Sequence, residues 1–285
     1  MILSQLLAIC RRETARIPDA APGEAEILVS AVTGIPRGRL FLSMDDDVGD
    51  ASVRLFPLIA RRSAREPLQY VLGAWDFFGR EFLLSPDTLI PRPETEGLAE
   101  RAVAALRRSP MARPLALDVG AGSGAIAVTL AAEVPAARVV ATDISPGALR
   151  KACENAARHG VAARVLPICC DLFSALKCGG RFAVVVSNPP YVAEGEGPLL
   201  PPEVRDHEPP EALLAGRDGL SVLRPLVAGA AGLLSPGGEL WCEIGASQGE
   251  AASSLPCGTL RSLGVFPDLA GRDRYAGWKK PEREL

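Results

Sequence analysis

The feature that most constrains the fold is an apolar run that ends abruptly in a polar motif. Residues 182–187 read Phe-Ala-Val-Val-Val-Ser, and residues 188–191 read Asn-Pro-Pro-Tyr. A β-branched run without polar alternation predicts a strand buried on both faces, as in parallel sheets. The prolines cannot continue that strand, because they lack N–H groups and have a fixed φ angle. Asn188 is therefore expected at the carboxyl end of a buried strand, where ligands bind in open α/β sheets.

The polar motif offers hydrogen-bond acceptors to a substrate that carries an –NH2 group. Asn188 supplies a side-chain carbonyl, and the backbone carbonyls beside Pro189 and Pro190 are not needed by a continuing strand. Tyr191 adds an aromatic face or a hydroxyl. An amide or aryl-amine nitrogen is a poor nucleophile, and accepting hydrogen bonds from it fixes it and raises its electron density. The alternative is a strand that simply ends in a Pro-Pro turn, and the motif alone leaves both interpretations open.

Strands and helices alternate in the region that contains this motif, which predicts a mostly parallel, doubly wound α/β sheet. The predicted strands cover 115–119, 139–143, 165–171 and 182–187, with helices at 125–133 and 146–159. A long loop at 194–215 is expected to precede a helix at 220–234, a strand at 239–244 and a closing pair at 264–267 and 274–278.

The first seventy residues show no strand alternation and predict a small helical bundle. Apolar residues at helical spacing place the helices near 2–10, 25–32 and 53–65. Because the apolar start is short and charged residues follow it, it is interpreted as an amphipathic helix rather than an export signal. The expected organisation is a helical N-terminal domain at 1–73, a β-hairpin linker at 74–88 and an α/β domain at 89–285.

A stiff segment leads into the α/β domain. Residues 89–96 read Leu-Ile-Pro-Arg-Pro-Glu-Thr-Glu, and the two prolines favour an extended backbone. Thr95 is predicted to cap the helix that continues to Leu106. An arginine between prolines, followed by two carboxylates, is dense charge for a mere linker.

Composition narrows the function classes. A chain of 285 residues with 48% hydrophobic content can bury a large core, and a net charge of −3 gives no electrostatic footprint for nucleic acid. The seven cysteines contain no C-x-x-C pair, which favours reduced thiols in the cytoplasm. No stretch is long enough to span a bilayer, and the aspartates at 45–47 lack the spacing of a calcium loop, so neither membrane nor metal is expected.

A glycine turn and three aspartates are the candidate cofactor site. Residues 120–124 read Gly-Ala-Gly-Ser-Gly and lack the third glycine of a dinucleotide-binding G-x-G-x-x-G motif. Asp143 ends the second strand, where it can accept ribose hydroxyls, and Asp171 ends the third, where it can bind an adenine amino group. Each aspartate alone could be a turn former, but together with Asn188 they favour S-adenosylmethionine and an amine-type substrate. The candidate cofactor residues are Asp118, Gly120, Ala121, Gly122, Ser123, Gly124, Asp143, Asp171, Leu172 and Asn188.

These motifs resemble the HemK/PrmC family of release-factor glutamine methyltransferases. The matching stretches are Pro67–Gly73, Leu89–Glu96, Asp118–Gly124, Asp143–Ser145, Asn188–Tyr191, Glu208-Pro209, Asp218–Leu220 and Glu243–Gly245. Asn-Pro-Pro-Tyr is shared with DNA amino-methyltransferases and specifies chemistry rather than substrate. The motif Pro-Arg-Pro-Glu-Thr-Glu is more specific to this family. It also separates this family from the ribosomal-protein glutamine methyltransferases.

The resemblance implies a class I S-adenosylmethionine-dependent methyltransferase that modifies the glutamine of the Gly-Gly-Gln motif in peptide chain release factors. It assigns the substrate glutamine to Asn188, Pro189, Pro190 and Tyr191. It places Leu172 beside the adenine, where many relatives carry tryptophan. It also implies that the N-terminal bundle helps to bind the release factor and that the enzyme is a cytoplasmic monomer.

Two other function classes remain as alternatives. A nucleic-acid amino-methyltransferase would share the Asn-Pro-Pro-Tyr chemistry but would need base flipping and phosphate contacts. The net charge of −3 disfavours such phosphate contacts. A non-catalytic nucleotide-binding module or a dinucleotide oxidoreductase is disfavoured by the shortened glycine pattern. In the methyltransferase interpretation, positioning supplies most of the acceleration, and neither His159 nor His207 has to act as a base.

Overall fold

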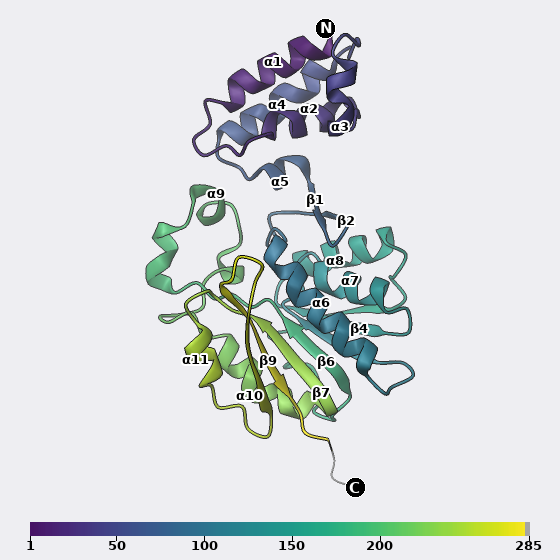
Figure 1. The fold of residues 1–285 in the computed structure, drawn as a ribbon, viewed down its shortest axis with the longest axis vertical. Coiled ribbons are helices and arrows are strands. Elements are labelled where there is room, and N and C mark those ends of the chain that lie inside the picture. Colours follow the sequence, from purple (N-terminus) through teal and green to yellow (C-terminus); the bar gives the residue numbers. More distant parts are fainter. Residues whose placement is uncertain (283–285) are drawn as a thin grey trace. The chain divides into compact units, whose positions relative to one another are not determined.

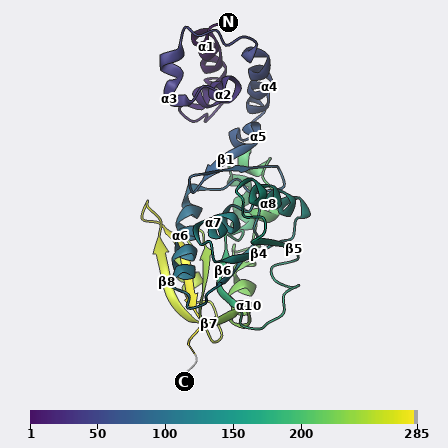
Figure 2. The same ribbon diagram turned by 90° about the vertical axis from the view of Figure 1, so that its right-hand side faces the viewer.

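The computed structural model describes residues 1–282, which form two compact units (Figures 1 and 2). Unit 1 comprises Met1–Ala74 together with the short segment Pro201–His207. Unit 2 comprises Trp75–Leu200 and the chain from Glu208 onward. No helix within the described residues is long and apolar enough to cross a membrane.

Unit 1 is helical, as the sequence predicts. Its buried side chains include Leu3, Leu6, Leu28 and Leu55, which lie on three different helices. The third of these helices begins at Ala51, two residues earlier than predicted. The elements are α1 (Leu3–Thr14), α2 (Glu24–Thr33), α3 (Arg37–Leu40), η1 (Phe41–Ser43), α4 (Ala51–Ser63), α5 (Leu68–Leu72) and, from the distant segment, α9 (Pro202–Arg205).

A charge network joins the segment 201–207 to the helices of unit 1. Arg62 of α4 donates to both carboxylate oxygens of Glu24 and to Glu203 of α9. Arg65 donates to the second oxygen of Glu203 at 2.8 Å. The Arg62 and Glu24 side chains are only 4% and 6% exposed, so each would be a costly unpaired charge without the other. The network therefore fixes a segment that follows Arg62 by more than a hundred residues.

Unit 2 contains a seven-stranded sheet in the order β5-β4-β3-β6-β7-β9-β8. The first five strands in this order are parallel, and β9 runs antiparallel to both β7 and β8. The strands are β3 (Leu115–Val119), β4 (Arg138–Asp143), β5 (Val165–Cys169), β6 (Phe182–Ser187), β7 (Leu234–Glu243), β8 (Arg261–Pro267) and β9 (Asp273–Lys279). This is the doubly wound sheet predicted from the alternation of strands and helices.

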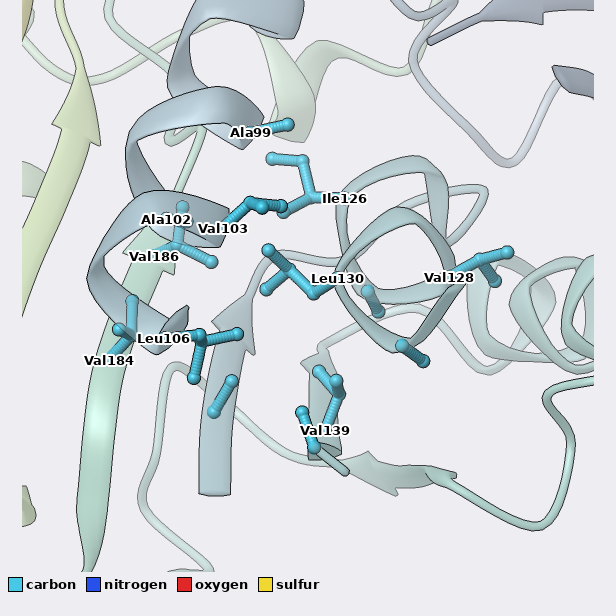
Figure 3. Close-up of a cluster of buried hydrophobic side chains, with 14 of the residues drawn as sticks. Ala99, Ala102, Val103, Leu106, Ile126, Val128, Leu130, Val139, Val184 and Val186 are labelled. Carbon is cyan, nitrogen blue, oxygen red and sulfur yellow. The ribbon is translucent and has the colours of Figure 1, made fainter. Parts of the chain in front are cut away.

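Helices bury both faces of the sheet. One cluster of apolar side chains joins α6 (Pro93–Arg108), α7 (Ala125–Glu133) and α8 (Pro146–Arg158) to one face, and a second joins α10 (Leu223–Leu233) and α11 (Gly249–Ser253) to the other. In β6, Val184 and Val186 belong to the first cluster and Val185 to the second, as alternation requires. Figure 3 shows the apolar side chains of α6 between Val184 and Val186 on one side and Ile126 of α7 on the other.

The hairpin predicted around Gly79 is present as β1 (Ala74–Phe77) and β2 (Arg80–Leu83). Phe77 and Phe82 pack edge to face at 6.0 Å and belong to the core of unit 2. Asn155 of α8 bonds both the N–H and the carbonyl of Leu83, which fixes the end of the hairpin. Several boundaries differ from the prediction. β5 ends at Cys169 rather than 171, α10 begins at Leu223 rather than 220, and β8 begins at Arg261 rather than 264. The loop 194–215 contains η2 (Glu194–Leu199), α9 and η3 (Pro210–Ala212), and β7 begins at Leu234 rather than 239.

Candidate active site

The site lies where the direction of strand order reverses. Along the chain β3, β4 and β5 follow one another to one side, whereas β6 pairs with the other side of β3. Val119 at the end of β3 is in register with Thr142 of β4 and with Ser187 of β6. Such a reversal leaves a crevice at the carboxyl ends of the strands. The sheet therefore brings the glycine turn, Asp143 and Asn188 to one edge.

A single cavity at this edge collects most of the predicted site residues. Of the thirteen predicted residues, all except Asp118, Gly124 and Tyr191 line it. Sequence reasoning missed two carboxylates of the lining, Asp87 and Glu211, which join Asp143 and Asp171. Within the described residues, no lysine, arginine or histidine lines this cavity. The cavity therefore favours a cationic ligand over a phosphate-rich one.

The glycine turn is shaped by backbone geometry that other residues resist. Gly122 has a φ of 55°, and its N–H donates to Asp143 Oδ2 at 2.8 Å. Gly124 precedes α7 with a φ of 79°, and a Cβ there would lie 2.9 Å from the Cβ of Ala152 on α8. Gly124 therefore serves the packing of α7 against α8, which explains its absence from the cavity surface.

Asp143 shapes the turn while keeping capacity for a ligand. Its Oδ2 accepts from Gly122 N–H and its Oδ1 accepts from Ser145 N–H, each at 2.8 Å. A carboxylate oxygen has two lone-pair sites, so each oxygen can accept one further hydrogen bond. Burial raises the pKa of Asp143, while these backbone N–H groups oppose the rise.

Asp118 lies beneath the turn rather than on the cavity. Its Oδ2 accepts from the N–H of Ala127 in α7 at 2.9 Å, and its fully buried Oδ1 has no partner within the described residues. Burial raises the pKa of Asp118 to about 7. We infer that Asp118 acts by supporting the turn and the start of α7.

The chain just after β5 supplies the far side of the cavity. β5 ends at Cys169, so the prediction that Asp171 ends the third strand is wrong by two residues. Asp171 is exposed and Leu172 is half-buried, and both line the cavity. Leu172 has a φ of 49°, in the left-handed region that L-residues other than asparagine and glycine avoid. Such strain persists only where the surroundings enforce it, and it concentrates at binding sites.

Asn188 is held so that one end of its amide faces the cavity. The strand end is fixed by Ser187, whose Oγ donates to Val119 O at 2.7 Å. Asn188 Nδ2 donates to Thr95 Oγ1 at 3.1 Å. No described residue donates to Asn188 Oδ1, and the side chain lines the cavity. Its carbonyl is thus available to accept a hydrogen bond from a ligand.

Thr95 does not have the predicted role. Helix α6 begins at Pro93 with Arg92 as its N-cap, and Thr95 is the third residue of the helix. The Thr95 hydroxyl instead donates to Glu243 Oε2 of β7 at 2.8 Å. The capping prediction is therefore wrong, because the stiff Pro-Arg-Pro segment starts the helix earlier. A local sequence signal cannot reveal a partner 148 positions away.

The loop after Asn188 returns to the same edge. Glu208, which is 3% exposed, accepts from Arg92 and from the backbone N–H of Ile90. Pro209 and Glu211, just beyond it, line the cavity. The stretch Glu208-Pro209 was visible in the sequence only through the family resemblance.

Tyr191 is not among the residues that line the cavity. Its backbone carbonyl accepts from Gln248 Nε2, which also donates to the carbonyl of Gly219. Burial, assisted by the nearby Glu243 carboxylate, raises the pKa of Tyr191 to about 12, so its phenol is neutral at physiological pH. The Tyr191 backbone therefore holds the motif in place.

Solved structures support the fold. The structure of the Thermus thermophilus 16S rRNA N2 G1207 methyltransferase RsmC, in complex with AdoMet and guanosine, is 19% identical, with a TM-score of 0.50 over 74% of this chain and 50% of that one. At this identity the likeness concerns the fold alone.

Family models and curated relatives cover almost the whole chain. The model of the methyltransferase small domain matches residues 103–198, and that of the PrmC N-terminal domain matches residues 5–73. The release factor glutamine methyltransferase of Cereibacter sphaeroides is 44% identical over 96% of both chains. That of Moorella thermoacetica is 44% identical over 91% of this chain and 92% of its own. The chain belongs to the family of release factor glutamine methyltransferases.

Proposed function

We propose that this enzyme transfers a methyl group from S-adenosylmethionine to the side-chain amide nitrogen of a glutamine in a peptide chain release factor. The glutamine is that of the Gly-Gly-Gln motif. The observation that carries the proposal is that one cavity joins an acid-lined glycine turn to the free carbonyl of Asn188. The names of the curated relatives supply the substrate class.

The cavity fits the charge of S-adenosylmethionine. This molecule carries a positive sulfonium, a positive ammonium and one carboxylate, whereas a dinucleotide carries two negatively charged phosphates. The four carboxylates of Asp87, Asp143, Asp171 and Glu211 attract the first and repel the second. The free lone pairs of Asp143 suit hydroxyl donors such as those of a ribose.

The residues of this chain then position the nucleophile. S-adenosylmethionine supplies the electrophilic methyl group when it is bound. Asn188 Oδ1 accepts a hydrogen bond from the substrate –NH2 and orients its nitrogen, while Pro189 and Pro190 line the wall beside it. The alkylated amide nitrogen is strongly acidic, so its proton is lost without a strong base. Most of the acceleration comes from orientation, which can be worth about 7–11 kcal/mol.

The partner and setting follow from this proposal. The substrate is a protein that acts in translation, which places the reaction in the cytoplasm. We propose that the enzyme works as a monomer without a nucleic-acid partner. The net charge of −3 supports the second point, because phosphate-binding surfaces are basic.

The test is transfer of a deuterated methyl group to a purified release factor, located by tandem mass spectrometry. Ribosomal RNA serves as the competing acceptor in a parallel reaction. The proposal predicts a single label on the glutamine of the Gly-Gly-Gln motif and none on RNA. Label on RNA bases, or on another side chain of the factor, would overturn it.

A further inference from the structure

A chain of hydrogen bonds runs from a buried carboxylate to Asn188. Glu243, which is 1% exposed, accepts from the Thr95 hydroxyl at 2.8 Å. Thr95, which is 4% exposed, accepts from Asn188 Nδ2 at 3.1 Å. Glu243 ends β7, and β7 pairs with β6 up to Cys242 and Ser187. Glu243 and Asn188 therefore lie at the carboxyl ends of two neighbouring strands, at the same edge of the sheet.

The direction of these bonds follows from the chemistry of the three groups. When Glu243 is ionised its carboxylate only accepts hydrogen bonds, so Thr95 must donate its single proton to Glu243. The Thr95 oxygen can then only accept, and the group that faces it must be the –NH2 of Asn188. If the amide were rotated, two oxygens would face each other with no proton between them. The order Glu243–Thr95–Asn188 therefore permits one orientation of the amide.

We propose that Thr95 and Glu243 are positioning residues that fix the amide orientation of Asn188, so that its carbonyl oxygen faces the substrate –NH2. This inference rests on the proposed function for the identity of the substrate. The orientation matters because the opposite one would present the Asn188 –NH2 to the substrate –NH2, and two donors cannot bond. The hydrogen-bonded series Glu243–Thr95–Asn188, called the relay below, sets this geometry before the substrate arrives.

The burial of Glu243 supports a specific role rather than packing. Its only side-chain hydrogen bond within the described residues is the one from Thr95. A buried carboxylate with so few partners is costly to keep, and an apolar side chain would serve packing alone at a lower cost. The alternative is that the Thr95–Glu243 contact only ties α6 to the end of β7.

Substitutions of Thr95 separate these two roles. Thr95→Val keeps the shape and removes the hydroxyl, whereas Thr95→Ser restores it. Thr129→Val is a matched control, because Thr129 is fully buried in α7 and its hydroxyl has no partner within the described residues. We expect Thr95→Val to lower kcat on an intact release factor about tenfold, the scale of one lost hydrogen bond. Thr95→Ser should recover most of that loss, and Thr129→Val should behave as the wild type.

The kinetic signature distinguishes positioning from stability. Thr95→Val should leave KM for the release factor and the calorimetric affinity for S-adenosylmethionine close to wild-type values. Wild-type kcat in Thr95→Val would overturn the proposal. So would equal losses in Thr95→Val and Thr95→Ser, or a loss accounted for entirely by a lower melting temperature.

A second measurement does not depend on the proposed function. The sequence contains only two asparagines, Asn155 and Asn188. Selective labelling of asparagine side chains with nitrogen-15 should therefore give two pairs of amide proton signals in an NMR spectrum. Asn155, whose Nδ2 donates to Leu83 O and Ser123 O, provides an internal reference.

One proton of the Asn188 amide should be shifted and protected from exchange in the wild type and in Thr95→Ser. This protection should disappear in Thr95→Val, with the Asn155 signals unchanged. If protection persists in Thr95→Val, the relay is wrong even if the release factor is methylated. If protection behaves as predicted but no release factor is methylated, the relay stands and the proposed substrate is wrong.

Discussion

At the scale of single residues, Asp143 shows how one side chain combines structural and binding roles. Its two oxygens each accept one backbone N–H at the turn and each keep a free lone pair. Asp171 also lines the cavity but is exposed. The two carboxylates are thus a natural pair for comparing the value of a buried and an exposed acceptor.

We predict that Asp143→Ala weakens the binding of S-adenosylmethionine far more than Asp171→Ala does. Hydrogen bonds to a charged acceptor are each worth about 1.5–3 kcal/mol, so the loss of one raises Kd at least tenfold. The exposed Asp171 competes with water and should matter less. Isothermal calorimetry of both variants provides the measurement, and an unchanged Kd for Asp143→Ala would show that this carboxylate serves the turn alone.

Glu243 is expected to make the reaction depend on pH. Burial raises its pKa to about 7, while the hydrogen bond from Thr95 and the charges of Arg274 and Arg92 lower it and Glu94 raises it. Below pH 7 the protonated carboxyl can itself donate to Thr95, which frees the Thr95 proton for the Asn188 oxygen. The single permitted amide orientation is then lost.

We therefore predict that kcat falls as the pH drops through about 7. In Glu243→Gln this acidic limb of the pH–rate profile should be absent, because a carboxamide does not titrate. The check is a pair of pH–rate profiles at saturating substrate. A limb that survives unchanged in Glu243→Gln would assign it to another group.

At the scale of elements, the strand–turn–helix unit from β3 to α7 depends on glycine for two separable reasons. Gly120 has a φ of 72° and open space around the position of a Cβ. Gly124 has a φ of 79°, and its Cβ would meet Ala152. An alanine at Gly120 thus meets only backbone strain, whereas one at Gly124 also meets steric overlap with α8.

We predict that Gly120→Ala lowers the free energy of unfolding by about 1–2 kcal/mol, the cost of a left-handed L-residue. Gly124→Ala should cost about 1–3 kcal/mol more, because overpacking adds to the same strain. Urea unfolding of the two variants measures the difference. Equal losses would mean that α8 shifts to make room for the added methyl group at no cost in the free energy of unfolding.

The elements that the sequence predicted best are those with a local signal. The apolar run 182–187 and the prolines after it placed Asn188 at a strand end, and the same reasoning placed Asp143. The mostly parallel, doubly wound sheet followed from the βα alternation, although β7 begins earlier than predicted, at Leu234. Periodicity and breakers describe such elements fully because both act within a few residues.

The parts that could not be predicted depend on partners distant in sequence. Thr95 was assigned to capping because its bond to Glu243 spans 148 positions. Asp87 stands in a turn and Glu211 in the short helix η3, where nothing local marks a residue that lines a cavity. Glu203 lies in a stretch rich in proline and glutamate, and only the fold brings it to Arg62.

At the scale of the whole molecule, the chain interrupts unit 2 to complete unit 1. It leaves unit 2 after Leu200, contributes the segment 201–207 to the helical unit, and returns at Glu208. Glu203 holds this segment through Arg62 and Arg65. Glu208, which accepts from Arg92 within unit 2, follows immediately. Glu203 thus contributes to the helical unit, which is predicted to bind the release factor.

We predict that Glu203→Ala lowers kcat/KM for an intact release factor about tenfold, equivalent to about 1.4 kcal/mol of lost positioning. Arg205→Ala is the control in the same helix, because among residues 1–282 the Arg205 side chain bonds only the exposed Asp206. Steady-state kinetics of the two variants decide the matter. Equal efficiencies in Glu203→Ala and the wild type would show that the ion pairs of Glu203 do not contribute to activity on the release factor.

The most direct test of the account is single-turnover methyl transfer by Asn188→Ala at saturating S-adenosylmethionine, with the release factor as acceptor. The account assigns to Asn188 the acceptor that orients the substrate amide, and Asn188 Nδ2 bonds Thr95 rather than any of the cavity carboxylates. Loss of one positioned partner in a preorganised site costs about 2.7–4 kcal/mol, so transfer should slow by about a hundredfold or more while cofactor affinity is kept. Transfer at a near wild-type rate would contradict the account.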